Sequence, residues 1–385
     1  MKSDCIEKMM SVIEKGVRMQ LEKLDDLLAH VPEDENDFIH KMKEACIYHT
    51  FIKRYANMII LTYSHTQIFS SELGLAVSET LEYIRMFGIK TYVEYRGEKI
   101  LPGSQLLTAY SIFETVLEEI LHNVSAVLVR VDISRDIIIK MEYNEVINDQ
   151  SIRRLCQKIK TFGCEITVET DEKVSFITLV VPENASNSTI HEIISDQISV
   201  TGLGKGRGTA ALYREMFQLK IKIHDDIGGA LLAFRAYLCQ SQEKRERGNL
   251  LELWKNARAL FKEKVHENSG DSWEMLIKTA KASDVVIDYR GKMPEKESLR
   301  TVLTAVCQEC LLNTVKHAGG NRLYITISSS DNTIIAEIKN NGRPPVKEIK
   351  ETGGLRNLRW MVENAGGMMH IDVLSGFMLQ VRLPG

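Results

Sequence analysis

The stretch QECLLNTVKHAGG, residues 308–320, indicates the fold of the C-terminal part of this chain. Glu309, Asn313 and Lys316 lie at i, i+4 and i+7, so a helix would project them from one face, and His317 follows directly. Such a group suits Mg²⁺ and phosphate, because an amide offers a neutral oxygen to a hard metal and an ammonium offers charge to phosphate. An ordinary amphipathic helix with a solvated face is the alternative interpretation.

Two glycine-containing segments follow the predicted helix Leu299–Ala318. Asn340–Gly342 comes directly after a predicted strand, and Thr352–Leu358, which reads TGGLRNL, opens a helix to about residue 363. Glycines at a helix N-terminus let backbone N–H groups approach an anion, which the helix dipole also favours. A turn and a helix cap explain each segment taken alone, but their order after the charged helix favours a phosphate site.

In this order the motifs resemble the ATP-binding domain of the Bergerat-fold superfamily, and specifically that of sensor histidine kinases. QECLLNTVKHAGG is similar to the N box, NNGRP to the G1 region and TGGLRN to the G2 box. The ending AGGMMHIDVLSGFMLQVRLPG is similar to the final strands of the family. The resemblance implies that ATP and Mg²⁺ are bound.

The resemblance also implies roles for the N-box residues. Asn313 would hold Mg²⁺, and Glu309 would support the water shell of the metal. Lys316 and His317 would contact phosphates.

The glycine segments receive their roles in the same way. Asn340 would take the place of the aspartate that recognises adenine, and Gly342 would let the base approach. Gly353, Gly354 and Leu355 would close over the phosphates. A neutral amide is a weaker acceptor than the carboxylate that the family usually has at position 340.

The sequence HDDIGG begins at His224, inside a predicted helix over residues 210–240. Apolar residues flank it at helical spacing, which predicts that His224 borders a bundle core while Asp225 turns toward solvent. The segment resembles the dimerisation and phosphotransfer hairpin of histidine kinases, which implies that His224 accepts the phosphoryl group and Asp225 acts as general base. The glutamine that the family uses for dephosphorylation falls on Gly229, which favours kinase over phosphatase activity. A solvated histidine beside packing glycines is the alternative.

The chain repeats part of itself. Tyr95–Gly97 recurs as Tyr289–Gly291, each time after a strand-like run and before an apolar-periodic helix that reads Glu-x-x-x-Asn. Alternating strands and a closing proline follow in both copies. The first copy keeps Glu119 and Asn123 but lacks the lysine, the histidine and the glycines, so it is predicted to be degenerate, with a sensory, scaffolding or dimerising role.

The predicted fold class is therefore α+β: a helical hairpin plus an α/β sandwich of the Bergerat ATPase fold, occurring twice in tandem with the first copy degenerate. Five segments are predicted. They are an N-terminal helical region (1–90), a degenerate ATPase-like domain (91–182), a linker (183–209), a dimerisation and phosphotransfer hairpin (210–283) and an ATP-binding domain (284–385).

Composition narrows the class of protein. Of the 385 residues, 44% are apolar and 26% charged, and the net charge is −3, which argues against disorder and gives no basis for nucleic-acid binding. No apolar run reaches the roughly 18–20 residues that cross a bilayer. The odd number of seven cysteines shows no disulfide spacing, and Cys307 and Cys310 are predicted to be buried thiols. A cytoplasmic location is the expectation.

These observations predict an ATP-dependent histidine kinase that autophosphorylates on His224 and passes the phosphoryl group to an aspartate of a response regulator. Dimerisation through the hairpin, or an internal pseudo-dimer, is expected. A nucleotide-binding regulatory or scaffold protein without phosphotransfer is the alternative from another class. A serine kinase of the anti-sigma-factor type is a weaker one, because it lacks a phosphoacceptor hairpin.

Overall fold

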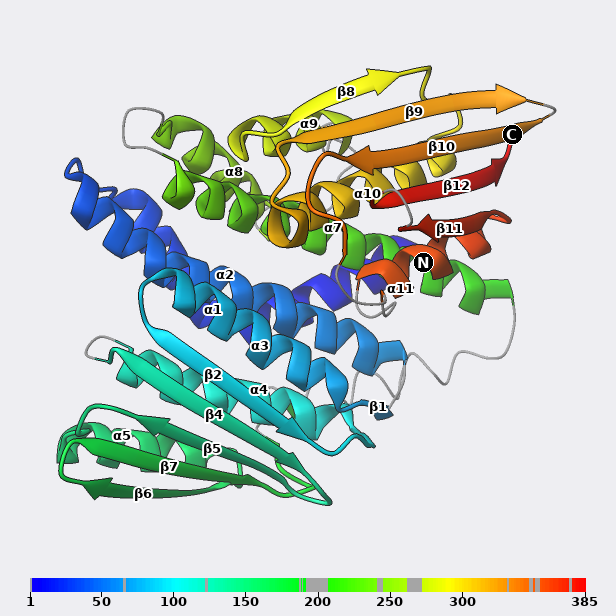
Figure 1. Cartoon of the computed structure of the whole chain (residues 1–385). Coiled ribbons are helices and arrows are strands. Elements are labelled where there is room, and N and C mark those ends of the chain that lie inside the picture. Colours follow the sequence, from blue (N-terminus) through cyan, green and yellow to red (C-terminus); the bar gives the residue numbers. More distant parts are fainter. Residues whose placement is uncertain are drawn as a thin grey trace. The chain divides into compact units, whose positions relative to one another are not determined.

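A computed structural model describes residues 2–64, 67–121, 124–186, 188, 190–191, 207–240, 245–261, 272–330, 332–345, 349, 354–373 and 376–385. Its contacts divide the chain into two compact units, Met1–Lys220 and Ile221–Gly385. Each unit combines helices with a five-stranded sheet (Figure 1), which confirms the predicted α+β class. The boundaries of the five predicted segments stay predictions.

Unit 1 opens with a helical hairpin and continues into a layer of strands. Its elements are α1 (Lys2–Ala29), α2 (Glu35–Ser64), β1 (Gln67–Phe69), α3 (Ser71–Met86), β2 (Lys90–Arg96), β3 (Ile100–Pro102), α4 (Gly103–Ile120), β4 (Ala126–Ile133), β5 (Ile137–Tyr143), α5 (Asp149–Lys160), β6 (Glu165–Asp171) and β7 (Val174–Val181). Alternate residues of β4 are buried, as expected for a strand with one face toward helices.

Unit 2 begins within the long helix α7 (Arg207–Cys239). The elements that follow are α8 (Arg247–Ala259), α9 (Ser272–Ala282), β8 (Val286–Arg290), α10 (Glu297–Asn313), the π-helical turn η2 (Thr314–Ala318), β9 (Arg322–Ser330), β10 (Thr333–Asn340), α11 (Gly354–Asn364), β11 (Met368–Asp372) and β12 (Met378–Pro384). Trp254 of α8 is fully buried and donates from Nε1 to the carbonyl oxygen of Ala230 in α7 at 3.3 Å, which ties the two helices of this hairpin together.

The two sheets have the same topology. The strand order is β2-β4-β5-β7-β6 in unit 1 and β8-β9-β10-β12-β11 in unit 2. In each sheet the first pair is parallel, joined across a helix, and the other pairs are antiparallel. The architecture therefore occurs twice in tandem, as predicted, while duplication of an ancestral segment remains a hypothesis.

Matching side chains hold both sheets at one end. Asn144 Oδ1 accepts hydrogen bonds from the backbone N–H groups of Ser125 and Ala126, at 3.1 and 2.8 Å. In unit 2, Asn341 Oδ1 accepts in the same way from residues 321 and 322, at 3.0 and 2.9 Å. Asn144 directly follows β5, and Asn341 directly follows β10. Each asparagine therefore ties the end of its own strand to the start of the neighbouring strand, β4 or β9.

Equivalent glycines mark the opposite end. Gly97 and Gly291 both have positive φ, of 84° and 102°, where a side chain would be strained. A Cβ at either position would also meet a backbone carbonyl oxygen, that of Ile133 or that of Ile327. The repeated Tyr-Arg-Gly sequence thus marks a turn that passes tightly over the sheet in both copies.

The helical region predicted over residues 1–90 is interrupted by a strand. The structure ends α2 at Ser64 and begins α3 at Ser71. Between them, β1 pairs with β3, and Ser70 exchanges hydrogen bonds with Lys99, 29 residues away. The local apolar pattern could not reveal this break, because the partner strand lies far along the chain.

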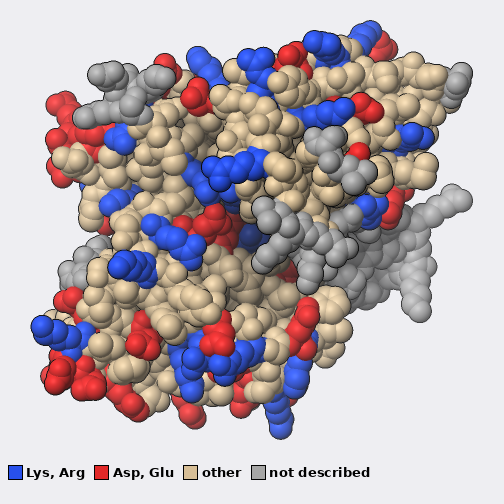
Figure 2. All heavy atoms as spheres, viewed as in Figure 1, with Lys and Arg blue, Asp and Glu red and all other residues tan. Residues whose placement is uncertain are grey.

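Charged side chains of both signs are mixed on one face of the molecule (Figure 2). On the face that Figure 2 displays, Lys and Arg lie among Asp and Glu, in keeping with the net charge of −3. None of the helices in the described part of the chain combines the length and the hydropathy that crossing a bilayer requires.

Candidate functional site

The candidate nucleotide site begins at the end of α10. Glu309 and Asn313 are both half-buried, and Asn313 Nδ2 donates a hydrogen bond to Glu309 Oε1 at 3.1 Å. Their i, i+4 spacing on a helix brings the two groups together. Because the amide nitrogen faces the carboxylate, the amide oxygen is the atom that Asn313 can offer to a cation. The amide oxygen of Asn313 and the carboxylate oxygens of Glu309 are the kinds of ligand that Mg²⁺ prefers. The two residues therefore fit the metal that the family resemblance implies.

A π-helical turn follows at once and carries the two predicted phosphate contacts. Gly319 ends η2 in the left-handed region, with a φ of 60°, and the backbone N–H of Gly320 donates to Thr314 O at 3.1 Å. Lys316 is half-buried and His317 is exposed. A π turn re-aims side chains relative to an α-helix and often occurs at functional sites. The sequence pattern predicted a plain α-helix here and missed this turn.

The Asn340–Gly342 turn lies against the end of η2. Gly342 N donates to Asn340 Oδ1 at 3.0 Å, and Arg343 N donates to Ala318 O at 2.9 Å. A Cβ at Gly342 would lie 2.7 Å from Ala318 O, so only glycine fits this approach. The structure therefore brings the Asn340–Gly342 turn together with the end of the helix that carries Lys316 and His317.

The glycines before α11 are described only in part. Helix α11 begins at Gly354 and packs beside α10, and Leu355 in its first turn is half-buried. Gly353 lies outside the described residues. The helix that was expected after TGG is thus present, and it stands next to the helix of Glu309 and Asn313.

The candidate phosphoacceptor lies in α7, and its surroundings differ from the prediction. The side chain of His224 is 35% exposed and that of Asp225 is 15% exposed, so the carboxylate is the more buried of the two. The expectation that Asp225 turns toward solvent was wrong, because the helices packed on α7 set which face is covered. His224 Nδ1 lies 3.5 Å from Asp225 Oδ1. Burial raises the pKa of the neighbouring Asp226 to about 6, and Lys222 opposes that rise.

The two glycines after Asp226 have packing partners within unit 2. A Cβ at Gly229 would lie 2.8 Å from Thr279 Oγ1 of α9. A Cβ at Gly228 would lie 3.9 Å from Leu312 Cδ1, next to Asn313 on α10. Gly229 therefore allows α7 and α9 to approach closely, which explains a glycine at a mid-helix position.

The first copy has an ion pair near the corresponding position. Counted from Gly97 and Gly291, Glu119 takes the place that Asn313 has in the second copy, rather than that of Glu309. Arg154 Nη2 of α5 contacts Glu119 Oε1 at 2.6 Å, which neutralises this carboxylate within the copy. Asn123 lies outside the described residues.

Cys307 and Cys310 are fully buried in α10, and burial raises the pKa of the Cys307 thiol to about 12. The prediction that both thiols are buried is confirmed.

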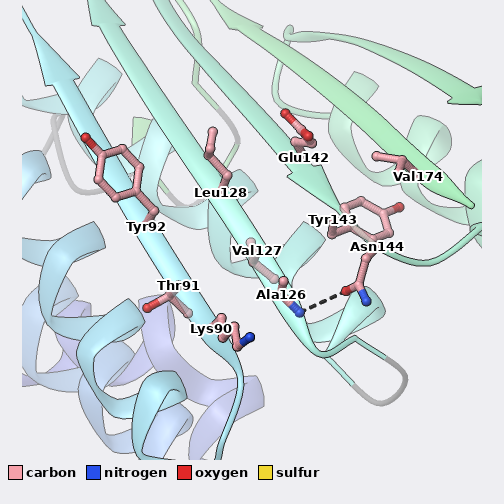
Figure 3. A pocket seen from close by; sticks show the side chains of 10 residues that line it. All are labelled: Lys90, Thr91, Tyr92, Ala126, Val127, Leu128, Glu142, Tyr143, Asn144 and Val174. Carbon is pink, nitrogen blue, oxygen red and sulfur yellow. Dashed lines mark hydrogen bonds between the residues drawn. The ribbon is translucent and has the colours of Figure 1, made fainter.

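A pocket that the sequence did not suggest lies on the first sheet (Figure 3). It encloses about 270 Å³ near the start of β2 and β4 and the end of β5. The polar residues in its lining include Lys90, Tyr92, Glu142 and Asn144, and Leu128 is among the apolar ones. None of the predicted site residues lines it.

Comparisons with known proteins match part of the chain. No protein-family model matches it. The sensor protein VraS of Staphylococcus aureus (strain COL) is 26% identical over 116 residues, which cover 26% of this chain and 33% of that protein. VraS of Staphylococcus haemolyticus (strain JCSC1435) is 25% identical over 116 residues, with the same coverage. The chain thus spans about a third of the length of the curated relatives it matches.

Solved structures give a weaker likeness. The blue-light activated histidine kinase of Erythrobacter litoralis EL346 has a TM-score of 0.28 and 14% identity, over 62% of this chain and 82% of that one. The Acinetobacter baumannii histidine kinase AdeS has a TM-score of 0.27 and 10% identity, over 44% and 95%. Likeness at these scores supports no statement about function. The sequence relationship is more direct: over about a quarter of its length, this chain is homologous to the sensor protein VraS.

Proposed function

We propose that the chain is an ATP-dependent protein histidine kinase that phosphorylates itself on His224 and transfers the phosphoryl group to an aspartate of a response regulator. The observation that supports this most is the Asn313–Glu309 pair at the end of α10, beside a π turn that carries Lys316 and His317. The amide of Asn313 can bind a cation, and Lys316 and His317 can contact phosphate oxygens. This set suits a nucleoside triphosphate, since phosphoryl transfer depends on positioning and on neutralisation of charge.

His224 is suited to be the nucleophile. Its side chain is partly exposed, so a phosphate group can reach it. Asp225 can accept the proton on Nδ1, which leaves the lone pair of Nε2 for attack. In the proposed step the bond between the γ-phosphorus and the bridging oxygen breaks, an N–P bond forms at Nε2, and ADP leaves. Mg²⁺ held by Asn313 would neutralise phosphate charge.

The partners follow from the same proposal. A response regulator would supply the receiving aspartate, and the helical hairpin would mediate dimerisation, either between two chains or between the two copies of one chain. Gly229, whose position fits close packing on Thr279, has no side-chain amide for the dephosphorylation reaction.

A regulatory protein that binds nucleotide without phosphotransfer is the second candidate, and one observation favours it. Asn340 Oδ1 already accepts a hydrogen bond from Gly342 N at 3.0 Å, so this neutral oxygen is partly engaged before it meets adenine. Weak adenine recognition would fit a sensor of nucleotide better than an efficient enzyme.

Incubation of the full chain with radiolabelled ATP·Mg²⁺ separates these candidates. The kinase predicts an acid-labile label that is lost in His224→Gln and Asn313→Asp and kept in His370→Gln, which changes an exposed histidine of β11. Nucleotide binding without label would support the regulatory protein. An acid-stable label that persists in His224→Gln would support a serine kinase.

A further inference from the structure

Helix α4 carries a buried carboxyl group on the side that packs on the α1–α2 hairpin. Glu114 is 1% exposed, and neither of its side-chain oxygens has a hydrogen-bond partner among the described residues. Around it, α2 packs on α4 through apolar and aromatic contacts, such as the stacked rings of Phe51 and Tyr110 at 5.2 Å. A carboxyl group without partners in such surroundings is stable only when it is uncharged.

The charged and titratable groups that face Glu114 come from three helices. Helix α1 contributes Lys23, α2 contributes Tyr48, and α4 itself contributes Tyr110 and Glu118. Glu44 of α2 lies beyond, where its charge acts on Tyr48. Beyond Tyr110 lie Arg54 of α2 and Glu79 of α3, which pair with each other. The sheet behind α4 contributes buried apolar side chains of β5 and β7.

Lys23, whose charge acts on Glu114, is already paired with another carboxylate. Lys23 Nζ contacts Glu118 Oε2 at 2.8 Å and lies 4.9 Å from the ring centroid of Tyr48. Glu118 therefore brings a negative charge close to Glu114, one helical turn away. Burial first, and then the charge of Glu118, raise the pKa of Glu114 well above its ordinary value, while Lys23 lowers it.

The second copy has a neutral side chain at the same place. Glu114 follows Gly97 by 17 residues, and Gln308 follows Gly291 by the same 17 residues. Gln308 is 2% exposed, and its amide atoms likewise lack partners among the described residues. Both copies thus bury a polar side chain at this position, but only the first copy buries one that can ionise.

We propose that Glu114 is a proton-binding latch that holds the α1–α2 hairpin on α4. With its proton, the carboxyl group fits the apolar interface between α2 and α4. Without it, an unpaired carboxylate remains in that interface beside the charge of Glu118, and the hairpin separates from α4 so that water can reach both groups. The latch would give the first copy a response to pH at a position where Gln308 gives the second copy none.

The direction of the pH effect follows from the bound proton. The closed state binds the proton more tightly than a state in which Glu114 meets water, so closure is favoured at low pH. The free energy that protonated Glu114 contributes to closure is complete below the ordinary pKa of a glutamate. It is lost as the pH rises through the raised pKa of Glu114. One linked proton changes the opening equilibrium tenfold per pH unit in that window.

Two measurements on the full chain test the latch, with Glu114→Gln as the variant and Glu142→Gln as the matched control on an exposed strand position. Hydrogen exchange, corrected for the intrinsic pH dependence of amide exchange, reports opening of α1 and α2. In the parent and in the control, we expect the protection factors of α1 and α2 to fall as the pH rises, by up to tenfold per pH unit. In Glu114→Gln we expect these protection factors to be independent of pH. Infrared difference spectra should show a carboxylic-acid carbonyl band at neutral pH that only Glu114→Gln lacks.

The infrared titration keeps the proposal falsifiable even where Glu114→Gln does not fold, because its overturning result needs only the parent. A parent without an acid carbonyl band at pH 7 would overturn the proposal. Equal pH dependence of hairpin protection in the parent and in a folded Glu114→Gln would overturn it as well. Neither measurement involves nucleotide, so both are independent of the proposed kinase activity.

Discussion

Asn313 and Glu309 form a hydrogen-bonded pair, Nδ2 to Oε1 at 3.1 Å, on one face of α10. The bond fixes which end of the amide points away from the carboxylate. A ligand that is oriented before the metal arrives binds it more tightly than one that must reorient. The pair is therefore the part of the candidate site whose geometry most directly predicts an effect of mutation.

Replacement of Glu309 by Gln should weaken binding of ATP·Mg²⁺ by about 10–100-fold, the range typical for residues that orient a metal ligand. Asn313→Asp should weaken it by at least as much, because Nδ2 is replaced by an oxygen that repels Glu309. Calorimetric titration of nucleotide with and without Mg²⁺ measures both effects. Equal losses in the absence of Mg²⁺ would contradict a role through the metal.

Substitution of Gly342 should separate the Asn340–Gly342 turn from η2. In Gly342→Ala the new Cβ would collide with Ala318, so we expect a loss of about 1–3 kcal/mol in the stability of unit 2. All three tryptophans, at 254, 273 and 360, lie in unit 2, so urea unfolding followed by tryptophan fluorescence reports on this unit within the full chain. Gly248→Ala is the control, because nothing lies within 4 Å of a Cβ there.

The effect of Gly229→Ala should reverse sign with the residue at position 279. Alone, the new methyl group would lie 2.8 Å from Thr279 Oγ1, and this overlap outweighs the helix-propensity gain of about 1 kcal/mol. In a Thr279→Ala background the overlap is gone, so the same change should stabilise unit 2 by up to about 1 kcal/mol. The double-mutant cycle uses the same fluorescence measurement. Additive effects would show that the two helices do not meet at this point.

Asp226 should make unit 2 less stable as the pH rises. The pKa of Asp226, about 6, exceeds the ordinary value of 3.8, so folding favours the protonated carboxyl group. Its contribution to the stability of unit 2 is complete below pH 3.8 and is lost as the pH rises through 6. Asp226→Asn should therefore stabilise unit 2 at pH 7.5 by about 1–3 kcal/mol and have little effect near pH 4. The difference in urea midpoint between variant and parent across this range is the measurement. A difference that does not change with pH would argue against burial of an ionisable group.

Much of the fold could be predicted because the two copies support each other. The repeated Tyr-Arg-Gly turn, the alternating strands and the helix around Asn313 were visible as local patterns. The break between α2 and α3 was not, since β1 depends on a partner strand more than 30 residues away. Tertiary pairing overrode a local helical pattern there.

The candidate site was predictable in its residue types and less so in their surroundings. The pattern located His224 and Asp225 on α7 but assigned the greater exposure to the wrong residue, because the helical phase of burial depends on α9 and α10. The π turn after Asn313 and the buried carboxyl group of Glu114 had no local signature. Both arise from how a helix ends or packs, which a periodic pattern does not encode.

The ion pair between Lys23 and Glu118 joins residues 95 positions apart, and this separation matters while the chain is being made. At a synthesis rate of about 5–20 residues per second, α1 leaves the ribosome many seconds before α4 exists. Until α3 and then α4 are made, the apolar faces of α1 and α2 have only each other for cover. The first unit is therefore expected to complete its folding late in translation, and nascent chains that stall before residue 118 should be the ones that recruit chaperones.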